Sequence, residues 1–314
     1  MTATFSAPHF NDDEAAREFL ERLLWPEGPI CRHCGTINHA YKTNRPGVYR
    51  CAEKECRKDF SVTKGTIFER SHIALHKWLQ AFHLVASSKK GISAHQLHRM
   101  LGIGYEAAWF MEHRIREAMR DGGLAPLGGS GTPVEADETY FGKQENPKPS
   151  WQRRGRPYLK GGVGPTGKRA VVALVERGGR VRSFHPAVAD GVTVGKIVSE
   201  NIAKEARLIT DESKLYTKVG PQFASHETVK HSAGEYVRGD IHTNSIEGVF
   251  SIFKRGMKGI YQHCREKHLH RYLAEFDFRY NHRAKLGFND LDRTLAALRG
   301  VEGKRLTYHQ PRNA

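Results

Sequence analysis

The sequence predicts an α/β protein in which a mixed-sheet domain follows a smaller cysteine-rich and helical region. Three observations support this prediction. Four of the five cysteines form two pairs near the N-terminus, and a glycine- and proline-rich stretch at 122–133 interrupts the chain. After that stretch, apolar runs of β-forming residues alternate with helical patterns. With 314 residues, the chain is long enough for two or three domains, at roughly 100–200 residues each.

The region before the stretch divides into three parts. Residues 12–25 have helical periodicity, and Pro26 ends the helix. The cysteines follow, and residues 71–120 again read as helices. We therefore expect an N-terminal helix (1–26), a cysteine module (27–70) and a helical region (71–121).

Five glycines and two prolines among twelve residues predict a linker at 122–133. The linker should lead into an α/β domain over 134–285. The pattern there predicts the order strand, strand, strand, helix, strand, and helices dominate from Thr243 onward. A C-terminal helix and tail should occupy 286–314, with apolar positions Leu291, Leu295 and Leu298. The expected strands cover 134–141, 168–175, 181–185 and 206–210, and the helix between the last two covers 192–203.

The charge balance points to a polyanionic partner. Fifty Lys and Arg against 34 Asp and Glu give a net charge of +16, which favours nucleic acid, although a merely basic soluble protein is the alternative. The hydrophobic content of 39% excludes a disordered chain, and no apolar run approaches the ~20 residues of a membrane span. The first residues lack a signal-peptide pattern, and the odd cysteine count argues against a disulfide scaffold. We therefore expect a cytoplasmic protein with no membrane partner.

The cysteine spacing predicts one structural zinc ion. Cys31-x2-Cys34 and Cys51-x4-Cys56 provide four thiols on two turns, which is the ligand set of a zinc ribbon. Four thiolates leave no open coordination position, so the site would be structural. The alternative is four scattered, buried thiols.

The helical region resembles a helix-turn-helix. A short helix and a glycine turn at 91–104 precede a longer helix at 105–119. The longer helix would enter a DNA groove, where Arg114, Arg116 and Arg120 would contact phosphates or guanines. An ordinary helical hairpin would give the same pattern.

Three acidic residues predict a divalent-metal site. Asp137 lies within an expected strand, Asp211 ends another, and Glu247 lies on a helix beside the apolar stripe of Ile246, Phe250 and Phe253. At ~100° per residue, Lys254 lies on the same edge as Glu247. Carboxylates brought together in this way bind a pair of Mg²⁺ ions in phosphoryl transfer. Singly, each acid has an ordinary explanation as a cap, turn or surface residue.

Basic residues surround these acids in the sequence and could contact DNA phosphates. Residues 143–167 contain Trp151, which could stack on an unpaired base, although a solvated loop is the alternative. The basic residues are Arg153, Arg154, Arg156, Lys160, Lys168, Arg169, Lys254, Arg255 and Lys258.

Taken together, these motifs resemble the DDE transposases of bacterial insertion sequences. The resemblance is to the group with a zinc ribbon and a ribonuclease H-like catalytic domain, insertion-sequence family fifteen ninety-five. It covers nearly the whole chain. The matching blocks are the two cysteine pairs, Phe60–Glu69, the helix-turn-helix, Glu135–Tyr140, Thr210-Asp211, Asn244–Gly248 with Lys254, Tyr261, His268-Leu269 and Phe276–Asn281.

The resemblance implies that Asp137, Asp211 and Glu247 hold the catalytic metal ions, with Asn244 as the alternative third ligand. It also implies that Lys254 contacts DNA at the cleaved end. The implied cofactors are two Mg²⁺ or Mn²⁺ ions in addition to one Zn²⁺.

The implied reaction is hydrolysis at the 3′ ends of the element, followed by attack of each freed 3′-hydroxyl on target DNA. The implied partners are the terminal inverted repeats, the target DNA and at least one further copy of the chain. Two alternatives remain at this stage: a DNA-binding regulator without catalysis, which would need only the first 121 residues, and a metal-dependent nuclease without strand transfer.

Overall fold

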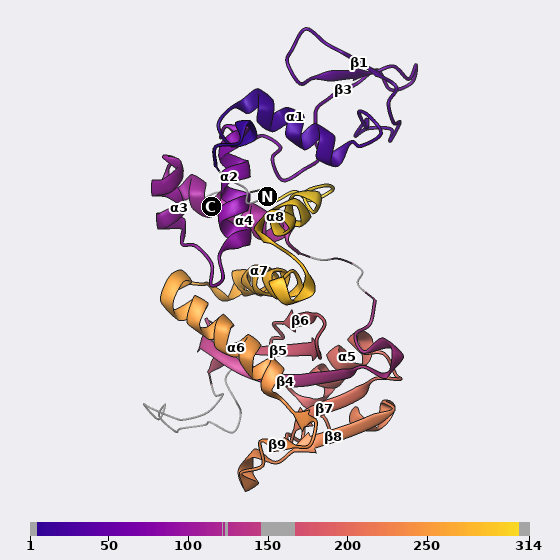
Figure 1. The fold of residues 1–314 in the computed structure, drawn as a ribbon, viewed down its shortest axis with the longest axis vertical. Helices are drawn as coiled ribbons and strands as arrows, with labels where there is room; N and C mark the ends of the chain where they lie inside the picture. Colours follow the sequence, from indigo (N-terminus) through magenta and orange to yellow (C-terminus); the bar gives the residue numbers. More distant parts are fainter. Residues whose placement is uncertain (1–4, 121, 123–124, 146–166, 308–314) are drawn as a thin grey trace, which may run out of the picture. The chain divides into compact units, whose positions relative to one another are not determined.

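The computed structural model describes residues 5–120, 122, 125–145 and 167–307. The chain forms two compact units (Figure 1). The first unit combines the residues up to Asp121 with those from His282 onward, and the second unit spans Gly122–Asn281.

The second unit contains a five-stranded mixed sheet with the order β6-β5-β4-β7-β8. β4 pairs with β5 and β5 with β6 in antiparallel register, whereas β4 with β7 and β7 with β8 are parallel. The mixed sheet that the sequence predicted is therefore present. The strands are β4 (Pro133–Lys143), β5 (Lys168–Glu176), β6 (Val181–Phe184), β7 (Arg207–Asp211) and β8 (Ser225–Val229).

Four of these strands, and the helix before β7, lie where the sequence placed them. The fifth, β8, was not predicted. Its residues Ser-His-Glu-Thr-Val are mostly polar and only Val229 is buried, because β8 is an edge strand.

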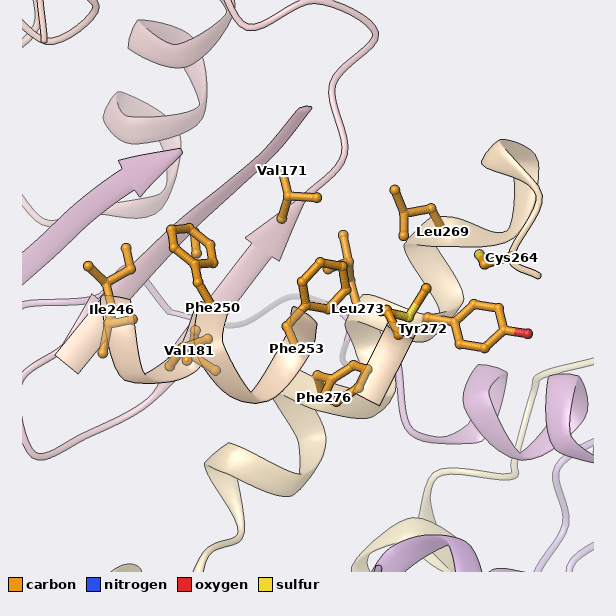
Figure 2. Packing of buried hydrophobic residues seen from close by; sticks show 14 residues of the cluster. Val171, Val181, Ile246, Phe250, Phe253, Cys264, Leu269, Tyr272, Leu273 and Phe276 are labelled. Carbon is orange, nitrogen blue, oxygen red and sulfur yellow. The ribbon is translucent and has the colours of Figure 1, made fainter. Parts of the chain in front are cut away.

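Helices cover both faces of the sheet (Figure 1). On one face, Val172 and Leu174 pack against Val194 and Val198 of α5 (Gly191–Asn201). On the other face, strand residues pack against α6 (Asn244–Gly256) and α7 (Leu269–Asn281). Figure 2 shows this second core, where side chains of both helices meet Val171 and Val181 of the sheet.

The apolar stripe expected around Glu247 is present. Ile246, Phe250 and Phe253 are each at most 6% exposed and belong to the α6 side of the core (Figure 2). Full burial of each such side chain contributes about 1.5–3 kcal/mol, so the stripe holds α6 against the sheet. A π-helical turn, Met257–Tyr261, follows α6 directly. A small hairpin of β9 (Val237–Arg238) and β10 (Ile241–His242) precedes α6.

The expected linker at 122–133 is in part a packed segment. Leu127 is 4% exposed, exchanges backbone hydrogen bonds with Asn201 and Ala203, and belongs to the α5 side of the core. Gly128 N donates to the Glu176 carboxylate at 2.9 Å. The glycine and proline content suggested a free linker, but one buried leucine attaches its second half to the sheet.

The described residues of the first unit form a three-stranded ribbon and five α-helices. The predicted helix at 12–25 and the predicted helical pair are confirmed. None of the described helices combines the length and the apolar character of a membrane span. The elements are α1 (Asp13–Leu24), β1 (Ala40–Lys42), β2 (Tyr49–Cys51), β3 (Asp59–Phe60), α2 (Leu75–Ser87), α3 (Ala94–Leu101), α4 (Tyr105–Ala118) and α8 (Asp290–Arg299).

The C-terminal helix is part of the first unit and not a separate tail. α8 packs against α2 and α4, and His83 Nδ1 lies 3.0 Å from Thr294 Oγ1 in the buried contact. Lys304 Nζ donates to the carbonyls of Ala118 and Arg120 at the end of α4. A cation at this position interacts favourably with the negative end of the helix dipole. Residues 1–121 therefore do not make a complete unit by themselves.

Candidate active site and metal centres

Asp137 and Asp211 lie on neighbouring parallel strands of the second unit. In the β4–β7 pairing, Glu135 is opposite Ile209, and the two aspartates each follow that pair by two residues. Because side chains alternate between the faces of a sheet, Asp137 lies on the same face as Glu135. Glu135 Oε2 accepts the backbone N–H of Ile246 in α6 at 3.0 Å, so this face of β4 is the one that α6 covers.

Glu247 lies in the first turn of α6, next to Ile246. Thr243, which is buried, donates its hydroxyl to Glu247 Oε1 at 3.2 Å. Glu247 and Asp137 line one cleft of about 800 Å³ between β4 and α6. The lining residues are Asp137, Glu138, Thr139, Glu247, Phe250, Ser251, Lys254, Arg255, Lys258 and Gly259.

The acids interact electrostatically around this cleft. The pKa of Asp137 is raised to about 8, mainly by burial, and the charges of Asp211, Glu138 and Glu247 contribute to this rise in that order. Burial also raises the pKa of Glu138, whose carboxylate accepts the Tyr216 hydroxyl at 2.9 Å. The three acids expected from the sequence are therefore brought together, and Glu138 is a fourth that was not expected.

This donor set fits divalent cations. All of its ligand atoms are carboxylate oxygens, which hard cations such as Mg²⁺ prefer. A divalent ion also relieves the repulsion that raises the pKa of Asp137. Among the described residues, the ligand atoms of the acids are spaced more widely than those of the cysteine cluster.

The basic residues expected near the acids have three different positions. Lys254, Arg255 and Lys258 line the cleft at the end away from the first turn of α6. Arg169 is buried and donates to the carbonyls of Lys143 and Cys264, so it stabilises the fold and does not face DNA. Trp151, Arg153, Arg154, Arg156 and Lys160 lie outside the described residues.

The four cysteines of the first unit form a metal centre. All their sulfur atoms lie within 4.8 Å of one another, with Cys31–Cys56 at 3.7 Å and Cys34–Cys51 at 3.6 Å. A tetrahedral zinc ion with Zn–S bonds of ~2.3 Å requires S–S separations of about 3.8 Å, so the cluster fits zinc. Beside it, Trp25, Tyr49 and Phe60 pack together with ring centroids 5.7–5.9 Å apart.

Two of the predicted DNA-binding arginines are buried, which corrects the sequence-based assignment. Arg116 is 1% exposed and pairs with Glu112 at 2.9 Å. Arg114 is 8% exposed and donates to the carbonyl of Ile67 at 2.8 Å. The assignment assumed that the C-terminal half of α4 was free, but α8 packs against α4. Arg120, whose side chain is 57% exposed, remains available.

The sequence reasoning missed the residues that support the acids, namely Glu135, Arg177, Tyr216 and Thr243. For Glu135 a signal was present: it precedes Asp137 by two residues and therefore shares its strand face. For the other three, only the folded arrangement shows the role.

Both units match family models. Residues 126–281 match the ISXO2-like transposase domain, and residues 11–59 match the transposase zinc-ribbon domain. The two models belong to the same insertion-sequence family and together cover about two thirds of the chain. The chain belongs to the ISXO2-like transposases. The family resemblance noted in the sequence is thus confirmed, and so is the structural zinc ribbon.

Individual proteins are also similar to this chain. A protein in the transposable element ISH50 of Halobacterium salinarum is 28% identical over 256 residues, which is 78% of this chain and 83% of that protein. Among solved structures, the Mos1 strand transfer complex is 11% identical with a TM-score of 0.28, covering 70% of this transposase and 73% of that chain. A Mos1 transposase paired-end complex with the left transposon end is 11% identical with a TM-score of 0.21, covering 65% and 76%.

Proposed function

We propose that this transposase binds the terminal inverted repeats of an insertion sequence, cleaves the 3′ ends of the element and joins them to target DNA. The observation that carries the proposal is the cleft of the second unit, which has Asp137, Glu138 and Glu247 on one part of its wall and Lys254, Arg255 and Lys258 on another. Phosphodiester chemistry needs both features, because acids hold the metal ions and cations hold the phosphates.

Asp137, Asp211 and Glu247 would hold two Mg²⁺ or Mn²⁺ ions. When bound, such a pair lowers the pKa of an attacking oxygen and stabilises the departing one. Asp137 would share the ions with the other two acids, since the charges of both Asp211 and Glu247 raise its pKa. Glu247 is favoured over Asn244 as third ligand because Glu247 lines the cleft and affects the pKa of Asp137.

The basic part of the cleft would hold the DNA backbone. Lys254 and Lys258 are four residues apart, about 6 Å along the helix axis, and lie on the same side as Glu247 and Ser251. A strand whose scissile phosphate lies at the acids could therefore place further phosphates against these two lysines. Lys254 would contact the phosphate nearest the cleaved end, and Arg255 would add a second charge at the rim.

The first unit would recognise the inverted repeats. In a helix-turn-helix, the N-terminal residues of the second helix contact bases. Here the second helix is α4, which begins at the exposed Tyr105, and the Tyr105 ring stacks on His95 of α3 with centroids 4.2 Å apart. Gln96 and Arg99 are exposed on α3. The zinc ribbon would contribute a second DNA contact. Because an element has two ends, the active form would be a dimer or a higher oligomer on DNA, acting in the cytoplasm.

Two other functions are less well supported. A regulator without catalysis would have no use for three acids whose charges all raise the pKa of a fourth, Asp137, at the cleft. A nuclease without strand transfer would use the same acids, and only an assay for joining separates it from a transposase.

The test uses an oligonucleotide ending in the element's 3′ end, a target plasmid, and Mg²⁺ or Mn²⁺. We expect cleavage and joined products with the full chain. Asp211→Asn should abolish both, at least a hundredfold, while DNA-end binding in a gel-shift assay stays within about twofold. Cleavage without joining would support the nuclease. DNA-end binding that does not depend on Mg²⁺ or Mn²⁺, with no cleavage, would support the regulator.

A further inference from the structure

We propose that Glu135 is a positioning residue that fixes Glu247 relative to Asp137. The inference rests on the proposed metal-dependent function and identifies the part of the fold that sets the spacing of its ligands. Glu135 precedes Asp137 by two residues on β4, and its backbone partner Ile246 directly precedes Glu247 on α6. One side chain therefore connects the two elements that carry these acids.

The Glu135 carboxylate is fully enclosed and both of its oxygens are occupied. Its side chain is 0% exposed. Oε2 accepts the Ile246 N–H at 3.0 Å, and Oε1 accepts Nε and Nη2 of Arg177 at 3.2 and 3.1 Å. His242 Nδ1 lies 3.6 Å from the same Oε1. With these bonds made and no contact with solvent, Glu135 is not itself placed to bind a metal ion in the cleft.

Arg177 extends this connection to the segment that leads into α6. It lies at the end of β5 and donates Nη1 to the Asp240 carbonyl at 2.6 Å and Nη2 to the His242 carbonyl at 3.1 Å. The ion pair between Arg177 and the buried Glu135 carboxylate thus ties β10 and the start of α6 to the sheet. The N–H groups in the first turn of a helix carry partial positive charge, so the Glu135 carboxylate also interacts favourably with the α6 dipole.

This arrangement has a direct consequence for metal binding. Apolar packing of Ile246, Phe250 and Phe253 holds α6 on the sheet, but such packing is non-directional and tolerates small shifts along the helix axis. The bond from Glu135 to a single N–H fixes the helix at its first turn. Replacing a residue that orients a metal ligand typically weakens metal binding by about 10–100-fold.

The test measures Mn²⁺ binding to the full, zinc-loaded chain without DNA, by the electron paramagnetic resonance signal of free Mn²⁺. Glu135→Gln keeps the shape of the side chain but loses its charge. We expect it to weaken Mn²⁺ binding about tenfold, while Asp137→Asn removes most of the binding. The matched control is Glu275→Gln: Glu275 is also 0% exposed in the second unit and pairs with Arg279, but on α7. It should bind Mn²⁺ like the wild type even where it lowers the melting temperature.

The outcomes separate the two levels of the proposal. Wild-type affinity in Glu135→Gln, with normal binding by the wild type, would overturn the positioning role and leave the proposed function intact. No Mn²⁺ binding by the wild type would overturn both. Equal weakening in Glu135→Gln and Glu275→Gln would mean a general loss of stability and would also overturn the positioning role. If Glu135→Gln does not fold, Arg177→Lys replaces it, and this variant should show a smaller loss of Mn²⁺ affinity.

Discussion

Asp137 and Asp211 stand at equivalent positions on two parallel neighbouring strands, and the charge of Asp211 adds to the effect of burial in raising the pKa of Asp137. Two carboxylates held together in a partly buried cleft destabilise the fold unless a cation lies between them. A divalent cation bound between them, as proposed above, would remove this unfavourable interaction.

The first prediction concerns pH and stability without added divalent ions. The pKa of Asp137 is about 8 in the folded chain, against about 3.9 in an unfolded one. Between these values the folded state holds a proton that the unfolded state has lost, so the contribution of Asp137 to stability falls as pH rises and levels off above about pH 8. Asp137→Asn removes this contribution. Its melting temperature should exceed that of the wild type by several degrees at pH 8 and by little at pH 4.

The measurement is differential scanning calorimetry of both proteins from pH 4 to 8.5. Each kcal/mol corresponds to roughly 2–4 °C for a domain of this size. Adding Mg²⁺ at pH 8 should raise the wild-type melting temperature and leave that of Asp137→Asn nearly unchanged. A constant difference between the two proteins across the pH range would contradict the prediction.

The second prediction concerns the zinc ribbon. Cys51→Ser should reduce the zinc content from one ion to nearly none and unfold the ribbon, because a four-thiolate site supplies much of the folding free energy of such a small module. Elemental analysis and proteolysis of the ribbon would show this. Cys264→Ser, which removes a cysteine outside the cluster, should keep one zinc per chain. Full zinc content in Cys51→Ser would argue against the assignment.

The third prediction concerns the basic part of the cleft. Lys254→Ala and Lys258→Ala should each weaken binding of a DNA end and reduce the slope of log K against log salt by about 0.7–0.9, the value for one phosphate contact. Fluorescence anisotropy over a salt series measures both effects. Lys196→Ala on α5, whose side chain is 73% exposed on the opposite face of the sheet, is the control. An equal slope change in the control would mean that the cleft lysines have no special role.

The fourth prediction separates the arginines of α4. Arg116→Ala leaves Glu112 charged and buried, so it should lower the stability of the first unit by about 3–5 kcal/mol. Arg120→Ala, at an exposed position, should change stability by less than about 0.5 kcal/mol. Urea unfolding followed by circular dichroism gives both values. The double variant Arg116→Met with Glu112→Leu should recover much of the lost stability, because it removes both buried charges. If Arg116 only contacted DNA, neither the loss nor its recovery would be expected.

The sequence by itself determined much of this protein. Cysteine spacing predicted the zinc centre because thiolate chemistry and short turns are local properties. Residue periodicity predicted four of the five strands of the sheet, the helix that covers one face and the helical pair, because alternation and helical repeat also follow from neighbouring residues. The positions of Asp137, Asp211 and Glu247 on two strands and a helix were readable in the same way.

Only the tertiary structure decided which residues face solvent and which support the site. Arg114 is buried against the carbonyls of Ile67 and Leu306, which lie 47 and 192 residues away. The helix that carries Arg116 packs against α8, which lies more than 170 residues later in the chain. Leu127 attaches half of an apparent linker to the sheet, and Glu135 connects β4 to α6 across 111 positions. Each of these depends on contacts between distant segments, and local sequence patterns carry no information about which distant segment will cover a given side chain.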